Sequence, residues 1–128
     1  MQTLGIGVDI IKNSRIKKSI ISKNFIYRVF SHEEIIESKK KKDKVSFFSK
    51  RFAAKEAFSK ALGSGFRNGL NFNDISVSND KYGKPSIQIN NKLKVLIKKK
   101  FKTSKVNTLL SISDEKKYSI AYVIIEKK

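Results

Sequence analysis

The chain has 128 residues and a formal net charge of +18, from 29 Lys and Arg against 11 Asp and Glu. This length is typical of a single domain, and a hydrophobic fraction of 39% can supply one core. The absence of cysteine excludes disulfides and thiolate metal sites. No apolar run is long enough to span a bilayer, which predicts a soluble protein. So basic a chain attracts an acidic partner, and nucleic acid, a phosphate-bearing small molecule, an anionic membrane and an acidic protein all fit this description.

The first part of the chain is predicted to form a strand followed by helical segments. Residues 4–11 are an apolar run with a single acid, Asp9, and predict a strand. Asn13 or Ser14 can cap a following helix, and a second short amphipathic segment lies around residues 30–36. The predicted inward face of the first helix consists of Ile16, Ile20 and Phe25.

The longest predicted helix covers residues 45–62, where no Gly or Pro interrupts the chain and several alanines favour helix. Gly63 is expected to end it. A hairpin, a third helix and two strands follow. Their predicted ranges are 75–78 and 86–89 for the hairpin, 93–101 for the helix, and 108–113 and 118–125 for the strands. We therefore predict a single α+β domain over residues 1–128, with about three helices packed on an antiparallel sheet.

Glu56 and Lys60 lie four residues apart on the longest helix, so they share one of its faces. Such a pair is usually a surface salt bridge, and the spacing alone leaves that interpretation open. The neighbours Phe52 and Ala57, however, make this segment too apolar for a plain solvated face. Nearby basic residues, and glycines that let a backbone approach a ligand closely, favour a binding site instead.

Asp9 also has two interpretations. An acid at the end of an apolar strand often caps the next helix. Alternatively, a strand acid and a helix acid together form the sparse carboxylate set that Mg2+ takes when phosphate oxygens and water complete its coordination. Asp9, Glu56 and the basic residues near them therefore suit phosphoryl-group chemistry.

Two other sets of polar side chains are weaker candidates. His32 precedes two glutamates and is expected to be an exposed residue at the start of a helix. The hydroxyls of Ser111 and Ser113 alternate with apolar residues, so both point to one face of a strand. Such a row usually faces solvent, although it can also bind phosphate.

Several segments resemble the motifs of acyl-carrier-protein synthases. The first, similar to the family's amino-terminal motif, is Gly5-Ile6-Gly7-Val8-Asp9-Ile10. The second, similar to its long central motif, is Arg51-Phe52-Ala53-Ala54-Lys55-Glu56-Ala57-Phe58-Ser59-Lys60-Ala61-Leu62-Gly63. Two later landmarks of the family are matched in the same order by Gly83-Lys84-Pro85 and Ser111-Ile112-Ser113. The resemblance runs from about Leu4 to Ile125 and so covers nearly the whole chain.

The resemblance implies a 4'-phosphopantetheinyl transferase fold and transfer of 4'-phosphopantetheine from coenzyme A to a serine of apo acyl carrier protein. The reaction would release adenosine 3',5'-bisphosphate and support fatty acid biosynthesis. By the same resemblance, Asp9 and Glu56 hold Mg2+, Glu56 or a water it holds is the base, and Lys60 stabilises phosphate charge. The positions that match nucleotide-binding residues of the family are Arg51, Lys55, Gly63, Lys84, Pro85, Ser111 and Ser113.

The resemblance further implies a homotrimer with active sites between subunits. Arg15, Lys18 and Arg28 lie where the family docks the acidic carrier protein, so charge complementarity would raise the association rate. One position departs from the family, which usually has histidine directly after the Ser-Ile-Ser motif where this chain has Asp114. An acid there would repel a phosphate unless it turns away or joins the metal, so the role of the histidine is not transferred to it.

Two other functions remain as alternatives. A small nucleic-acid-binding protein would explain the charge, but arginine is scarce and no nucleic-acid-binding motif is present, so no specific nucleic acid partner is expected. Codon bias can also produce the lysine excess without any partner. A purely structural subunit would leave Glu56 and Lys60 as a surface pair. No membrane partner is expected, and the expected compartment is a bacterial cytoplasm, or a plastid stroma after removal of a transit peptide.

Overall fold

The structure is a computed structural model, and it describes residues 2–67 and 69–128. The described residues form strands, α-helices and one 3-10 helix, η1, so the predicted α+β class is confirmed. The elements are β1 (Gln2–Lys12), α1 (Asn13–Ser19), α2 (Lys23–Val29), α3 (His32–Ser38), α4 (Lys44–Leu62), η1 (Phe72–Asp74), β2 (Ser76–Asn79), β3 (Pro85–Gln88), α5 (Asn91–Phe101), β4 (Val106–Asp114) and β5 (Tyr118–Lys127).

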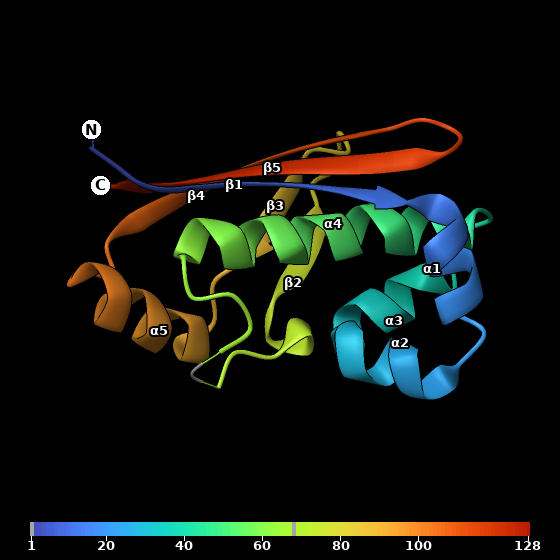
Figure 1. Cartoon of the computed structure of the whole chain (residues 1–128), viewed down its shortest axis with the longest axis horizontal. Helices are drawn as coiled ribbons and strands as arrows, with labels where there is room; N and C mark the ends of the chain where they lie inside the picture. Colours follow the sequence, from blue (N-terminus) through green and yellow to red (C-terminus); the bar gives the residue numbers. More distant parts are fainter. Residues whose placement is uncertain (1, 68) are drawn as a thin grey trace.

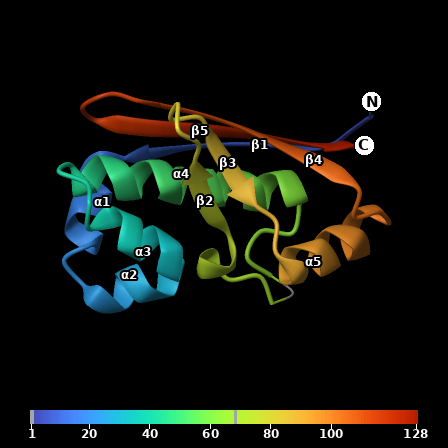
Figure 2. The same ribbon diagram turned by 180° about the vertical axis from the view of Figure 1, so that it is seen from behind.

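Helix α4 is the centre of the fold. It runs along one face of an antiparallel sheet with the strand order β1-β5-β4, and α1, α2 and α3 lie below one end of it while α5 lies below the other (Figure 1). Strands β2 and β3 pair only with each other in the described residues and form a separate hairpin. Seen from behind, this hairpin crosses in front of α4 (Figure 2). The two long elements that carry the predicted acids, β1 and α4, are thus direct neighbours.

Two glycines allow β1 to lie directly on α4. A Cβ atom at Gly7 would lie 2.0 Å from the carbonyl oxygen of Ala57, and one at Gly5 would lie 1.9 Å from that of Ala61. Both distances are far inside van der Waals contact, so only glycine fits at either position. The helix side of this contact is made of small alanines that are themselves buried. Asp9, two residues after Gly7, is thereby held beside α4.

The ends of α4 follow from its sequence. Asp43 caps the first turn, where its Oδ1 accepts a hydrogen bond from the backbone N–H of Ser46 at 3.0 Å. Gly63 closes the last turn in the left-handed conformation, with φ of 87°. The helix therefore covers 44–62, one residue more than the predicted range.

The described residues contain five α-helices rather than about three, and the additional ones lie before α4. The predicted first helix is broken after α1, since the side chain of Ser22 caps a new helix by accepting from the backbone N–H of Phe25. Asn13 does not cap α1. Its buried side chain instead donates to the carbonyl oxygens of Glu115 and Lys116 at 3.0 and 3.2 Å.

Among the described residues, no helix combines the length and the apolar character needed to cross a bilayer.

Candidate active site

Asp9 and Lys60 join β1 to α4 at the point that the sequence singled out. The Nζ atom of Lys60 lies 3.2 Å from Oδ1 of Asp9 and donates to the carbonyl oxygen of Val8 at 3.0 Å. Asp9 is therefore not a helix cap, and α1 begins after Lys12 without a side-chain cap. Within residues 2–67 and 69–128 the salt bridge of Lys60 is to Asp9 and not to Glu56, so the simple surface pair is absent.

Glu56 is the second carboxylate of this site, and the positive charge near it does not balance its own charge and that of Asp9. Burial raises the pKa of Glu56, and the negative charge of Asp9 raises it further, while Lys60 opposes both effects. Burial also raises the pKa of Asp9, against the hydrogen bond from Lys60. Two partly buried carboxylates that repel each other are stabilised by any added cation.

These two carboxylates fit a hard divalent cation, since Mg2+ prefers oxygen ligands and keeps several waters or phosphate oxygens in its shell. No group of three or more His, Cys, Asp or Glu side chains with metal-site geometry occurs in the described part of the chain. Asp9 and Glu56 alone would leave most of the coordination positions to a phosphate-bearing ligand and water. This donor set suits Mg2+ bound together with a diphosphate better than a permanently held structural metal.

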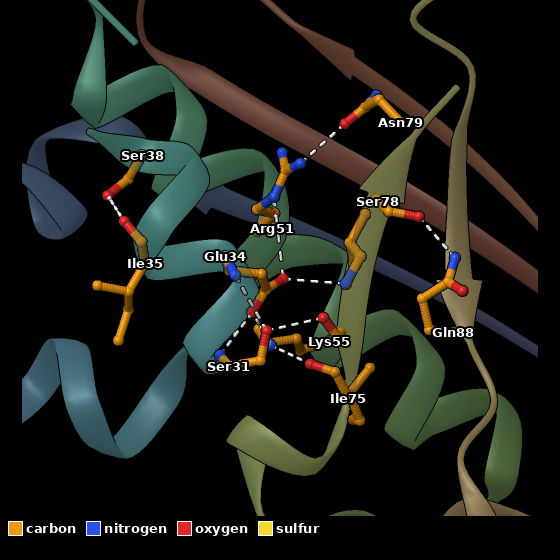
Figure 3. Close-up of polar contacts among 12 residues, drawn as sticks. Ser31, Glu34, Ile35, Ser38, Arg51, Lys55, Ile75, Ser78, Asn79 and Gln88 are labelled. Atoms are coloured by element: carbon orange, nitrogen blue, oxygen red, sulfur yellow. Dashed lines mark hydrogen bonds and ion pairs between the residues drawn. The ribbon is translucent and has the colours of Figure 1, made fainter. Parts of the chain in front are cut away.

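A second charge cluster lies on another face of α4 and is fully enclosed. Nζ of Lys55 lies 2.6 Å from Oε1 of Glu34 in α3, and neither side chain has exposed surface (Figure 3). Lys55 also donates to the carbonyl oxygens of Phe72 and Ile75. Burial lowers the pKa of Lys55 and the Glu34 carboxylate opposes this shift. Lys55 thus ties α4 to α3 and to the segment before β2, and its ammonium is not free at the surface.

Sequence reasoning missed Glu34, although a signal for it was present. Its Oε1 accepts from the backbone N–H of Ser31 and the Ser31 hydroxyl accepts from the backbone N–H of Glu34, which is a capping box. Its Oε2 also accepts from the backbone N–H of Val77 at 3.0 Å. The pattern Ser-x-x-Glu at 31–34 predicts the cap, but nothing in the sequence indicates that Lys55 pairs with it.

A cavity of about 650 Å³, which we call the hairpin pocket, lies between the start of α4, the β2–β3 turn and the end of β4. Two of the predicted nucleotide-binding residues, Arg51 and Pro85, are in its wall. Arg51 is anchored there, because its Nη2 donates to Oδ1 of Asn79 at 2.8 Å (Figure 3) and its guanidinium lies 3.9 Å from the ring centroid of Phe47. The full lining is Glu37, Lys41, Lys42, Asp43, Ser46, Phe47, Lys50, Arg51, Asn79, Asp80, Lys81, Gly83, Pro85, Ile112 and Asp114.

Comparison with known proteins identifies the family. Residues 5–123 match the profile of the 4'-phosphopantetheinyl transferase superfamily. The chain belongs to this superfamily. The holo-[acyl-carrier-protein] synthase of Pelagibacter ubique is 63% identical over 128 residues, which cover 100% of both chains. The predicted resemblance, fold and enzyme class are confirmed, and the chain is a phosphopantetheinyl transferase of the acyl-carrier-protein synthase type.

Solved structures agree with this assignment. The holo-[acyl-carrier-protein] synthase of Neisseria meningitidis has 34% identity and a TM-score of 0.87, with 98% of this chain and 99% of that chain covered. The holo-(acyl-carrier-protein) synthase of Bacillus anthracis in complex with CoA (3',5'-ADP) has 34% identity and a TM-score of 0.83, with 100% of both chains covered.

Other residues predicted for the transferase site lie outside both clusters. Ser111 and Ser113 are exposed on the sheet face that points away from α4, opposite Tyr122 and Ile120 of β5. Lys84 is exposed in the hairpin turn next to the hairpin pocket. Gly63 ends α4, where a Cβ atom would lie 3.3 Å from Cε of Lys100. A single chain therefore brings together Asp9, Glu56 and Lys60, whereas the remaining predicted positions lie in several separate places.

The predicted carrier-docking residues of the transferase are exposed on the first two helices. Arg15 and Lys18 lie on α1, and Arg28 lies on α2. Arg15 is near enough to Asp9 that its charge opposes the rise in the pKa of that carboxyl. Arg28 lines a cavity of about 540 Å³ whose other residues include stacked phenylalanines. The lining is Phe25, Arg28, Val29, Phe52, Phe66, Leu70, Asn71, Phe72 and Asn73.

Proposed function

We propose that this transferase moves 4'-phosphopantetheine from coenzyme A to a serine of apo acyl carrier protein and releases adenosine 3',5'-bisphosphate. The observation that carries the proposal is that two partly buried carboxylates, Asp9 and Glu56, share the single ammonium of Lys60. The names of the similar proteins, and the coenzyme A bound to one of them, support the two substrates. Supply of holo carrier protein to fatty acid biosynthesis, in a bacterial cytoplasm, is the proposed cellular role.

We propose that Asp9 and Glu56 hold Mg2+, which neutralises charge on the diphosphate of coenzyme A when it is bound. Lys60 stabilises negative charge on the phosphoryl oxygens or on the leaving group. Glu56 accepts the proton of the serine hydroxyl, directly or through a water, as the serine oxygen forms its bond to phosphorus. The bond from phosphorus to the adenosine bisphosphate oxygen breaks, and that group leaves.

A homotrimer with active sites between subunits is the proposed assembly. The sheet face that points away from α4 is apolar and exposed, which supports burial against other subunits. Its exposed apolar residues are Ile6, Val8, Ile10, Leu109, Tyr118, Ile120 and Tyr122. In addition, the nearest residue of α4 in the wall of the hairpin pocket, Arg51, lies about 14 Å along the helix from Lys60 at 1.5 Å per residue. A neighbouring subunit would bring its hairpin pocket to the Asp9 side of this one.

The assembly is tested by mixing two inactive variants. Asp9→Ala removes a metal ligand, and Lys50→Glu/Lys81→Glu reverses charge in the hairpin pocket. If each site takes Asp9 from one subunit and the pocket from the next, subunits mixed at random regain about one quarter of the sites. Sedimentation should give the mass of three chains. No recovery of activity, with both variants trimeric, would show that each site lies within one subunit.

Docking of an acidic carrier protein on Arg15, Lys18 and Arg28 is the proposed second binding step. Their exposure on α1 and α2, beside the phenylalanine-lined cavity, supports it. Charge reversal at these positions should raise KM for the carrier protein and weaken its salt dependence, while KM for coenzyme A stays unchanged. Equal changes in both KM values would contradict a docking role.

The overall proposal is tested by transfer of labelled phosphopantetheine from coenzyme A to apo carrier protein. Wild type should be active with Mg2+, should lose activity on chelation with EDTA, and should recover on adding Mg2+ back. Asp9→Ala and Glu56→Ala should be inactive while retaining the trimer mass. Activity that is unaffected by either substitution, or absent from wild type, would refute the assignment.

A further inference from the structure

Glu34, which the proposed mechanism does not use, joins three elements that surround the hairpin pocket. It is buried on α3, and both of its carboxylate oxygens have partners (Figure 3). Its Oε1 accepts from the backbone N–H of Ser31 at 2.8 Å and lies 2.6 Å from Nζ of Lys55 on α4. Its Oε2 accepts from the backbone N–H of Val77 on β2 at 3.0 Å. One side chain thus ties α3 to α4 and to the β2–β3 hairpin.

Glu34 also attracts the Arg51 guanidinium by charge. Its Oε2 lies 3.9 Å from Nε of Arg51, which is close enough for an ion pair and too long for a hydrogen bond. Arg51 is buried, and its Nε has no hydrogen-bond partner among the described residues. The guanidinium is otherwise held by the Phe47 ring and by Oδ1 of Asn79. Asn79 lies two residues after Val77 on β2, so the bond from Val77 to Glu34 also helps to place this partner of Arg51.

The Glu34 carboxylate is shared by two buried cations, Lys55 and Arg51. This group of three ionised side chains therefore has one positive charge in excess. Arg51 is its member in the wall of the hairpin pocket, whose lining holds five cations and four acids. Because a buried excess charge is stabilised by an opposite charge beside it, the pocket suits an anionic ligand at Arg51.

We infer that Glu34 is a positioning residue, which holds the Arg51 guanidinium where the hairpin pocket can bind a phosphate-bearing donor. The inference rests on the proposed function, in which this pocket takes the nucleotide end of coenzyme A. Glu34 itself is buried and touches neither substrate. It acts through Arg51, directly by charge and indirectly through the position of Asn79. Its loss should therefore weaken donor binding and leave the chemical step unchanged.

The double variant Glu34→Gln/Lys55→Met tests the inference, because it removes both members of the closest buried ion pair together. Glutamine supplies one carbonyl oxygen where glutamate supplies two, so it cannot accept from Ser31 and Val77 as glutamate does. KM for coenzyme A should rise about 10-fold, while kcat and KM for the carrier protein stay within about twofold of wild type. Calorimetry should show a similar loss of affinity for adenosine 3',5'-bisphosphate in the absence of the carrier protein.

Glu34→Asp is a milder variant that keeps the charge but is shorter by one methylene group. It should raise KM for coenzyme A about 3-fold and lower the bisphosphate affinity to match.

An Arg51→Met background shows whether Glu34 acts through Arg51. Arg51→Met should itself raise KM for coenzyme A, and adding Glu34→Gln/Lys55→Met should then raise it by less than about twofold more. Effects that simply multiply would contradict the inference, because they would mean that the two positions act independently.

Leu93→Ala is the control for lost stability, because it truncates a buried side chain on α5, outside the hairpin pocket. It should lower the melting temperature and leave both KM values unchanged. The inference is overturned if Glu34→Gln/Lys55→Met and Glu34→Asp keep the wild-type KM for coenzyme A and the wild-type bisphosphate affinity. It is also overturned if Leu93→Ala raises this KM equally. Absence of any transfer by wild type would instead refute the proposed function, while the bisphosphate affinities would still test the role of Glu34.

Discussion

Lys55 and Glu56 are adjacent in the sequence, yet they belong to two charge clusters of opposite character. The buried cluster of Lys55 and Glu34 is closed to solvent, and both side chains have several hydrogen-bond partners. The candidate active-site cluster of Asp9, Glu56 and Lys60 is partly exposed, and its two carboxylates repel each other. Removing one member of such a buried pair leaves the other charge without compensation, which destabilises the fold. A carboxylate pair without enough positive charge is open to a ligand.

The largest expected difference between the clusters is in catalysis. Asp9→Asn and Glu56→Gln should each lower kcat/KM about 1000-fold, equivalent to about 4 kcal/mol of transition-state stabilisation. Both should leave the melting temperature equal or slightly higher, because burial disfavours the charged forms that they remove. Transfer kinetics and calorimetric unfolding at pH 7 measure the two effects. A large loss of stability in either variant would indicate that these acids, like the buried pair of Lys55 and Glu34, have a structural role.

Lys55→Met should show the reverse pattern, with a large loss of stability. It leaves Glu34 buried without its cation, which costs about 3–5 kcal/mol of unfolding free energy. Urea unfolding measures the loss, and the double variant Glu34→Gln/Lys55→Met should recover part of it. The exposed Lys99→Met is the matched control, expected within about 0.5 kcal/mol of wild type. A loss below about 1 kcal/mol for Lys55→Met would mean that the buried pair contributes little.

Gly7→Ala should show how activity depends on the position of Asp9 while its charge is kept. Its Cβ would lie 2.0 Å from a backbone oxygen of α4, so β1 must move and the protein should lose about 1–3 kcal/mol. Activity should fall more than this stability loss explains, because Asp9 moves with the strand. Gly65→Ala, which has no atom within 4 Å of the new Cβ, costs only backbone strain of about 1 kcal/mol. Equal effects of the two substitutions on activity would refute the close-contact argument.

The smallest expected effect is on the titration of Glu56. Its pKa is raised above 4.5, so the folded state binds its proton more strongly than the unfolded state does. The contribution of Glu56 to the free energy of unfolding should therefore fall as pH rises from about 4.5 through the raised pKa, and level off above it. In Asp9→Asn the pKa of Glu56 should shift down, because one cause of its rise is removed. Carboxyl NMR titration measures the shift, and an upward shift would contradict repulsion between the two acids.

Much of the fold could be predicted from the sequence, because α4 and the strands carry strong periodic signals. The predicted break at Gly63 and the exposed position of His32 at the start of α3 are confirmed. The division of the first helix was missed, since Ser22 can act either as a helix residue or as a cap. Only the tertiary contacts decide between these two roles.

For the site, the sequence motif located Asp9, Glu56 and Lys60, which the structure brings together. Alternation correctly placed Ser111 and Ser113 on one face of β4, but it cannot say which face α4 covers. Likewise, the position of Lys55 in the sequence predicts on which side of α4 it lies. Its burial, however, depends on Glu34, 21 positions earlier in the chain. Long-range packing of this kind leaves no local trace in a single sequence.

The contact of β1 with α4 also has a consequence for how the chain folds correctly. A strand that slips by two residues along its partner keeps the same side chains facing the helix, so hydrophobic alternation alone does not reject the error. In β1 such a slip would press Thr3 or Asp9 onto a helix carbonyl in place of a glycine. The two glycines therefore select one register of β1 on α4, and this register fixes the position of Asp9 along the helix.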